Sequence, residues 1–111
     1  MKLKEFINAV NAQFLTSEIE TDMEISGGYA SDLLSDVMGN AHEGQIWITI
    51  MRHLNVVAVA SLANIAAVIF SNKMKPDEAV IKKANEEGII LLATNMTTFE
   101  VAGRLYQLLH P

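Results

Sequence analysis

Three stretches in the second half of the chain have the composition of buried β-strands. They are Gln45–Ile50, Ala66–Phe70 and Ile89–Leu92, and each is a run of branched, aromatic or aliphatic side chains with few polar interruptions. Strands that are apolar at successive positions have both faces covered, which is typical of parallel sheets.

Helical signals separate these strands. Asn55–Ala63 is rich in alanine and aliphatic residues and predicts a buried helix. Pro76 stands at a typical first helical position, and Gly88 at a typical end. Thr97 and Glu100 have the spacing of a capping box, which predicts a last helix from there almost to the end of the chain. The alternation predicts an α/β fold: a single domain with a mainly parallel β-sheet, built from βαβ units, and helices on both faces.

The first half of the chain carries weaker signals. They predict a helix, two short strands and a second helix, at Lys2–Val10, Gln13–Thr16, Glu20–Ile25 and Asp32–Met38. Ser31 is the expected N-cap of the second helix and Gly39 its expected C-cap. Four apolar side chains of that helix are expected to face inward: Leu33, Leu34, Val37 and Met38.

Length and composition narrow the class of protein. The 111 residues suit one domain, and 50% hydrophobic residues are enough for a core without cross-links. With no cysteine, disulfides, thiolate metal sites and a cysteine nucleophile are excluded. A net charge of −5 disfavours a broad nucleic-acid interface. We therefore expect no nucleic acid among the partners.

No membrane segment is expected either. The longest apolar stretch, Val56–Phe70, is interrupted by Ser61 and Asn64 and falls short of the roughly 20 residues that span a bilayer. The first residues interleave acidic and basic side chains and do not have the pattern of a signal peptide. These features predict a soluble cytoplasmic protein.

The break at Ser26, Gly27 and Gly28 is the first candidate binding element. It is expected to lie between a strand and a helix, where backbone N–H groups of a turn can bind an anion. The alternative is a plain tight connection in which the glycines relieve strain.

Two further candidates follow predicted strands, at the edge of the sheet where open α/β folds bind ligands. The first group follows the first buried strand and consists of Arg52, His53 and Asn55. Arg52 suits the binding of a phosphate or carboxylate, and His53 suits a proton-transfer role. The alternative is that Arg52 is a surface residue and Asn55 caps a helix. The second group follows the last strand and consists of Thr94, Asn95, Thr97 and Thr98. These polar groups can hydrogen-bond a small molecule, and the alternative is helix capping.

Four segments in register resemble the DRTGG domain. They are the residues from Gly27 to Met38, Trp47–Thr49 followed by Asn55–Ala60, Lys75–Glu78, and Thr98–Leu105. The resemblance covers essentially the whole chain, here as a stand-alone domain. In that family the domain also lies between paired CBS domains of some pyrophosphatases, and similar domains precede phosphotransacetylase catalytic regions and certain kinases. The resemblance implies an α/β fold and a regulatory or dimer-forming role, with catalysis left to a fused partner.

The family's name-giving motif is altered in this chain. By the resemblance, its Asp-Arg element falls near Arg52-His53, where only Arg52 matches, and its Thr-Gly-Gly turn falls near Ser71-Asn72-Lys73. That turn, in which Ser71 and Asn72 are candidate ligand-binding residues, keeps a hydroxyl and loses both glycines. Without the glycines, the turn is expected to lack the permissive backbone that lets a phosphate approach closely.

The remaining chemistry is sparse. No phosphate loop of the G-x-x-x-x-G-K-[ST] type and no G-x-S-x-G elbow is present, so a kinase or serine-nucleophile activity is not predicted. The histidines are dispersed, at His42, His53 and His110, and no metal or other cofactor is expected.

The excess of apolar residues predicts a homodimer, and the helices Asp32–Met38 and Asn55–Ala63 are its candidate face. The alternative is a monomer whose apolar residues all fit in the core.

The sequence thus predicts a non-catalytic regulatory or ligand-sensing module that acts through a partner protein. The alternatives are a binder of a nucleotide or other phosphorylated metabolite, and a small enzyme that uses His53.

Overall fold

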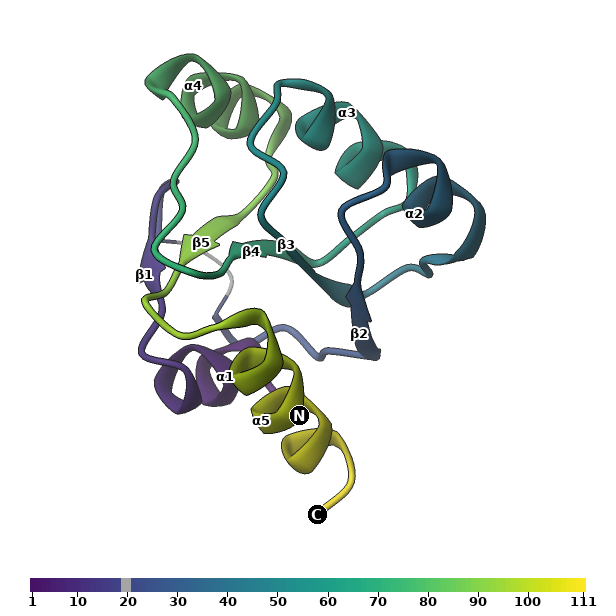
Figure 1. The fold of residues 1–111 in the computed structure, drawn as a ribbon, viewed down its shortest axis with the longest axis vertical. Coiled ribbons are helices and arrows are strands. Elements are labelled where there is room, and N and C mark those ends of the chain that lie inside the picture. Colours follow the sequence, from purple (N-terminus) through teal and green to yellow (C-terminus); the bar gives the residue numbers. More distant parts are fainter. Residues whose placement is uncertain (19–20) are drawn as a thin grey trace.

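The computed structural model describes residues 1–18 and 21–111. Its strands form one sheet and are β1 (Gln13–Phe14), β2 (Gly27–Ala30), β3 (Gln45–Thr49), β4 (Ala67–Phe70) and β5 (Leu91–Ala93). The helices are α1 (Leu3–Ala9), α2 (Leu34–Asn40), α3 (Asn55–Leu62), α4 (Glu78–Glu87) and α5 (Thr98–Leu109). Figure 1 shows the sheet between two layers of helices.

The sheet has the strand order β1-β5-β4-β3-β2. The four strands β2 to β5 are parallel, with Trp47 opposite Tyr29 on one side and Val68 on the other. Only β1 runs antiparallel, with Gln13 opposite Ala93. The predicted fold class is therefore confirmed: a single α/β domain with a mainly parallel sheet and helices on both faces.

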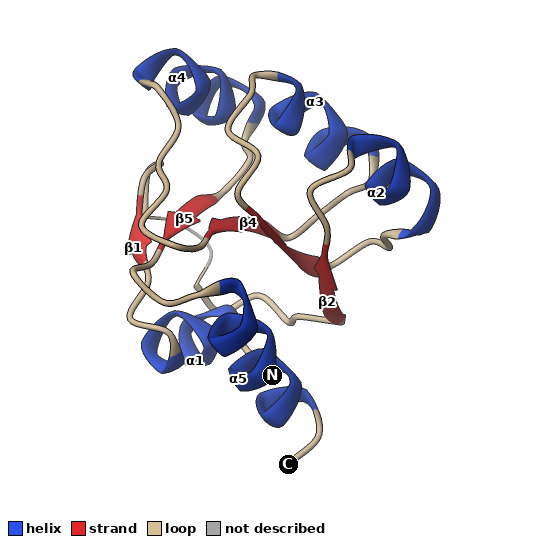
Figure 2. Cartoon of the chain, in the orientation of Figure 1, coloured by secondary structure: helices blue, strands red, loops and turns tan. Residues whose placement is uncertain are grey.

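The parallel strands follow one another in sequence order, and this decides which face each helix covers. Right-handed crossovers that all step in the same direction across the sheet bring their helices to the same face. Helices α2, α3 and α4 accordingly form one layer, and α1 and α5 form the other (Figure 2).

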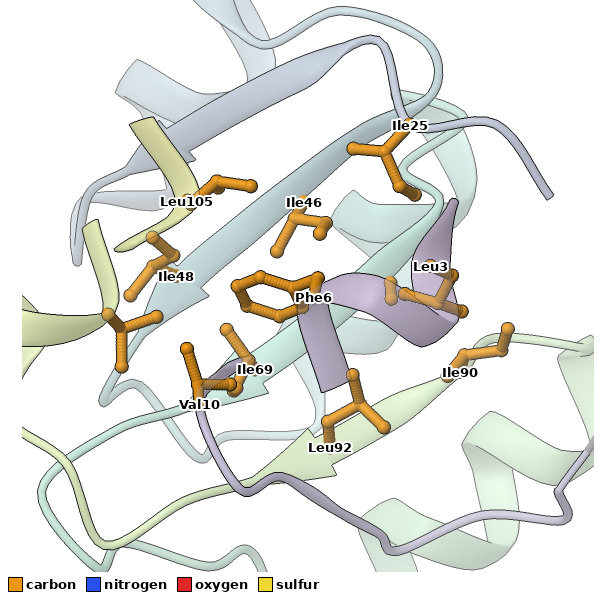
Figure 3. Packing of buried hydrophobic residues seen from close by; sticks show 12 residues of the cluster. Leu3, Phe6, Val10, Ile25, Ile46, Ile48, Ile69, Ile90, Leu92 and Leu105 are labelled. Carbon is orange, nitrogen blue, oxygen red and sulfur yellow. The ribbon is translucent and has the colours of Figure 1, made fainter. Parts of the chain in front are cut away.

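The core is divided by the alternation of side chains along the strands. On one face, Ile46, Ile48 and Ile69 pack with Leu92 against α1 and α5, and Phe6 of α1 lies in the middle of this cluster (Figure 3). On the other face, the buried strand side chains are Trp47, Val68, Phe70 and Leu91, which pack against α2, α3 and α4. The indole N–H of Trp47 donates to the Ser31 carbonyl at 2.8 Å, so this fully buried ring keeps its hydrogen bond.

The predicted break at residues 26–28 is wrong, because Gly27 and Gly28 begin strand β2. Glycine is needed here for packing and not for a turn. A Cβ atom on Gly28 would lie 2.4 Å from a side-chain methyl group of the buried Leu105, so the missing side chain lets α5 approach β2. Ladder pairing with β3 outweighs the low strand propensity of glycine.

The helix predicted over residues 32–38 lies two residues later, as α2. Leu33 occupies the N-cap position, and the Ser31 hydroxyl accepts from the Leu33 N–H at 3.2 Å instead of capping the helix. Gly39 lies within the helix. Of the four side chains predicted to face inward, only Val37 is buried, and Leu33 and Met38 are 63% and 48% exposed.

Other expectations differ in smaller ways. Of the strand predicted over 20–25, residue 20 lies outside the described residues, and the rest forms only an isolated bridge between Glu24 and Lys2. The N-cap before α4 is Asp77, one residue after Pro76. Gly88 is confirmed as the helix end, with a φ of +72°, and the capping box of Thr97 and Glu100 is confirmed at the start of α5.

In the part of the chain that the structure describes, no helix combines the length and the apolar character needed to cross a bilayer.

The contact between Gly28 and α5 can be tested by a substitution. Gly28→Ala should lower the free energy of unfolding by about 1–3 kcal/mol, because the buried Leu105 must move aside. Urea unfolding measures the change. Gly103→Ala in α5, the helix that carries Leu105, is the control. A Cβ atom on Gly103 would have open space around it, so this substitution should raise the free energy of unfolding by about 0.5–1 kcal/mol. Equal effects of the two substitutions would contradict the packing.

Candidate functional site

The carboxyl ends of β2 to β5 place four loops along one edge of the sheet, at residues 31–33, 50–54, 71–77 and 94–97. Most of the predicted binding residues lie at this edge: Arg52, His53, Asn55, Ser71, Asn72, Thr94, Asn95, Thr97 and Thr98. Ser26, Gly27 and Gly28 lie at the opposite edge, where β2 begins. The structure therefore separates the predicted residues into two groups.

The loops after β4 and β5 diverge at this edge. The chain leaves β4 toward α4, in one layer of helices, and leaves β5 toward α5, in the other (Figure 1). Neighbouring parallel strands whose connections go to opposite faces leave a crevice outside their carboxyl ends, which is where open α/β sheets bind ligands. In this fold that point lies between β4 and β5.

Hydrogen bonds join the loops after β4 and β5 directly at this point. The Ser71 and Thr98 hydroxyls lie 2.6 Å apart. The Asn72 N–H donates to the Met96 carbonyl at 2.8 Å, and the Lys73 N–H donates to the Thr94 carbonyl at 3.1 Å. These bonds fix the backbone of both loops and use the side chains of Ser71 and Thr98.

The other two predicted threonines, Thr94 and Thr97, also have structural partners. The buried Thr94 hydroxyl donates to the Val10 carbonyl at 2.6 Å and accepts from the Met96 N–H at 3.2 Å. The Thr97 hydroxyl accepts from the Glu100 N–H, and the Glu100 carboxylate accepts from the Thr97 N–H. The Thr97 backbone N–H and hydroxyl hold the pKa of Glu100 below its ordinary value. For Thr97 the capping interpretation therefore accounts for the side chain.

The loop after β3 is open to solvent. Arg52, His53 and Asn55 are all exposed. His53 Nδ1 accepts from the Asn55 N–H at 3.1 Å, next to the start of α3. Asn55 is the first residue of that helix, so its predicted role as the cap is wrong by one position.

A cavity of about 450 Å³ lies between β2 and α5, and the second group of predicted residues lines it. Ser26, Gly27 and Gly28 line its strand side. Tyr106 of the last turn of α5 and the C-cap residue His110 line the other side, with their rings stacked and the centroids 4.3 Å apart. The Ser26 hydroxyl donates to the Glu43 carbonyl at 2.8 Å. A strand start replaces the expected strand-to-helix turn, so the predicted anion-binding turn is not formed here.

A polar network that the sequence did not indicate connects β2 with α2. The Tyr29 hydroxyl donates to the Asp36 carboxylate, 2.8 Å from each oxygen, and the Asn40 amide donates to the same group at 2.9 Å. The Ser31 and Tyr29 hydroxyls and the Asn40 amide hold the pKa of Asp36 below its ordinary value of 3.8. Asp32, predicted at the start of a helix, instead precedes α2 and accepts from the Thr49 hydroxyl at 2.7 Å and the Ile50 N–H at 2.9 Å.

The histidines do not form a metal centre. In residues 1–18 and 21–111, no three histidine or acidic side chains gather closely enough to hold an ion.

Comparison with known proteins identifies the family. A family model of the DRTGG domain matches residues 5–108. The chain belongs to the DRTGG domain family. A comparison with curated proteins gave no match.

A solved DRTGG structure has the same fold. It is the CBS and DRTGG domains of the regulatory region of Clostridium perfringens pyrophosphatase, complexed with its activator, diadenosine tetraphosphate. The TM-score is 0.76 at 17% sequence identity, over 94% of this chain and 45% of that one. This chain thus spans less than half of the chain that it matches, and at this identity the likeness establishes the fold alone.

The altered DRTGG turn keeps a glycine-like backbone. Asn72 and Lys73, where the resemblance places the two glycines, have φ angles of +58° and +62°. Asparagine tolerates this left-handed region, and lysine adopts it at a cost of about 1–2 kcal/mol. The loss of the glycines therefore has not removed the backbone conformation that they favour.

The conformational cost at Lys73 predicts that its replacement by glycine increases the stability of the fold. Lys73→Gly should raise the free energy of unfolding by about 0.5–1 kcal/mol, because glycine adopts the positive φ without strain. Chemical unfolding in urea gives the value. Lys75→Gly is the matched control; this residue is not left-handed, and the added flexibility should destabilise the protein by a similar amount. A loss of stability with Lys73→Gly would contradict the left-handed conformation.

Proposed function

We propose that this chain is a non-catalytic regulatory module that works as a homodimer and acts through a partner protein. The observation that carries the proposal is an apolar surface on α2 and α3. Four large side chains on or beside these helices are exposed: Leu33 at 63%, Met38 at 48%, Leu54 at 46% and Leu62 at 70%. The two helices contact each other within one layer, and Leu54 and Leu62 also line a groove toward Lys83 and Glu87 of α4.

The charge pattern favours a second copy as the occupant of this α2–α3 surface. Helix α3 contains no charged residue, and the one acidic residue of α2, Asp36, is hydrogen-bonded to Tyr29 and Asn40. Lys83 and Glu87 of α4, which border Leu54 and Leu62, pair with each other at 3.2 Å. Two copies with a net charge of −5 each can therefore approach through this face with little repulsion. Homodimer interfaces are also the most apolar class of protein interface.

The hydrogen bonding at the carboxyl edge supports a non-catalytic role. His53, Ser71, Thr94 and Thr97 each take part in a hydrogen bond that supports local structure. Among the described residues, none of these hydroxyls is hydrogen-bonded to a histidine, the contact that activates a serine or threonine nucleophile. The similarity to a pyrophosphatase regulatory region is consistent with this role.

The dimer is tested by charge substitution at its proposed interface. The natural chain should sediment as a dimer, and Leu62→Glu should raise the dissociation constant at least about 30-fold, because a buried carboxylate would replace an apolar contact. Tyr106→Glu, at a side chain 65% exposed on the opposite layer, is the control and should leave the dimer intact. A monomeric natural chain, or a dimer lost only with Tyr106→Glu, would contradict the proposal.

The crevice between β4 and β5 supports a second candidate function, the binding of a nucleotide or other phosphorylated metabolite. Its loops carry Asn72, Lys73 and Asn95, and Arg52 stands on the loop of the neighbouring strand β3. These groups offer the cationic and amide donors that phosphates accept.

Thermal unfolding tests this second candidate. Diadenosine tetraphosphate, the activator in the solved DRTGG structure, serves as the probe. At about tenfold excess over its dissociation constant, it should raise the Tm by about 4 °C or more, and Arg52→Ala should remove the rise. Lys82→Ala, on the exposed face of α4, should retain it. An unchanged Tm in the natural chain would count against binding of this nucleotide, and an undiminished rise in Arg52→Ala would exclude Arg52.

A further inference from the structure

A small polar cavity opens at the carboxyl edge of the sheet, on the side of the crevice toward β1. Its volume is about 50 Å³, and its lining consists of Asn11, Gln13, Lys73, Lys75, Ala93, Thr94 and Asn95. Two lysines and three side-chain amides thus surround one small space, and no acidic side chain lines it. In a chain with a net charge of −5 this is a local concentration of cationic and N–H donors.

Three separate parts of the chain are held in place to form this cavity. Ladder pairing with Ala93 places Gln13 beside the end of β5. The hydrogen bond from the Lys73 N–H to the Thr94 carbonyl connects the loop after β4 to the same point. The buried Thr94 hydroxyl, which donates to the Val10 carbonyl, fixes the segment that leads to Asn11.

The backbone around the cavity is strained. Of the four residues other than glycine with a positive φ in the described chain, Asn11 (+51°) and Lys73 (+62°) line the cavity, and Asn72 (+58°) adjoins it. Such conformations cost free energy and cluster at binding sites, where the surrounding structure maintains them. Here the left-handed backbone at Lys73 places a cationic side chain at the rim of the cavity.

We propose that this cavity binds a phosphate group, with Lys73 and Lys75 as its cationic partners and the amides of Asn11, Gln13 and Asn95 as further donors. Its volume of about 50 Å³ suits a single phosphate group. A phosphate carries up to two negative charges and several acceptor oxygens, which match two ammonium groups and several amide N–H donors.

The proposal rests on the second candidate function and identifies its phosphate position. The rest of a phosphorylated metabolite would lie outside the cavity, along the crevice between β4 and β5. Of the lining residues, only Thr94 and Asn95 are predicted from the sequence, and the cationic partners are not.

Titration with inorganic phosphate, followed by ¹H–¹⁵N NMR, tests the site. At constant ionic strength, saturable shifts should be confined to the amides near residues 11–13, 72–75 and 94–96, with half-saturation at about a millimolar. Lys75→Ala should weaken binding about tenfold, and the combination of Lys73→Gly with Lys75→Ala should abolish saturation. Lys82→Ala removes the same charge elsewhere and should change nothing, and the spectra themselves report whether each variant is folded.

Three outcomes would overturn the proposal. The first is the absence of saturable shifts, and the second is equal shifts with acetate, which would indicate a general anion effect. The third is a set of shifts centred on residues 52–55 and abolished by Arg52→Ala, which would leave metabolite binding in place and relocate the phosphate. Failure of the second candidate function itself is measured separately, by the melting experiment with diadenosine tetraphosphate.

Discussion

The common direction of strands β2, β3, β4 and β5 is the constraint on which the rest of this domain depends. Because the four strands are parallel and adjacent in chain order, every crossover between them must place its helix on the same face. Helices α2, α3 and α4 thereby fill one layer, and the opposite face of the sheet is left for α1 and α5. The change of layer after β5 makes the boundary between β4 and β5 the topological switch point of the sheet.

This arrangement separates the two surfaces on which the proposed functions rest. The exposed apolar side chains of α2 and α3 lie on one layer of helices, and the candidate binding loops lie at the carboxyl edge of the sheet. Asp32 connects the two regions, since it precedes α2 and accepts hydrogen bonds from the Thr49 hydroxyl and the Ile50 N–H at the end of β3. A ligand at the carboxyl edge would therefore lie within the same set of loops from which the α2–α3 helices start.

The second half of the fold was predictable because its signals are local and agree with one another. The apolar runs at β3, β4 and β5, the left-handed Gly88 and the capping box at Thr97 each determine structure within a few residues. Strand β2 was not predictable from local signals, because its pairing with β3 and the close approach of Leu105 to Gly28 are tertiary contacts. Leu33 is exposed because it lies outside α2 as its N-cap, and Met38 is exposed because the inward side of the helix is formed by Leu34 and Val37. Local capping signals did not indicate either feature.

The candidate site was predictable only in part, for the same reason. Residues that follow strands, such as Arg52, Thr94 and Asn95, are placed at the correct edge once the strands are known to be parallel. Asn11 and Gln13 reach that edge through the antiparallel pairing of β1 with β5, which joins segments far apart in the chain. The left-handed φ of Lys73 is maintained by hydrogen bonds to the loop after β5. No local pattern in the sequence predicts either feature.

A native mass spectrum of the purified protein, recorded at low collision energy, tests the central claim most directly. It reports the number of chains and any retained small molecule in one measurement. The regulatory-module account predicts a dimer at twice the chain mass, and an added mass on that dimer would give the mass of a retained small molecule. A bare monomer at concentrations where homodimers are stable would contradict the account.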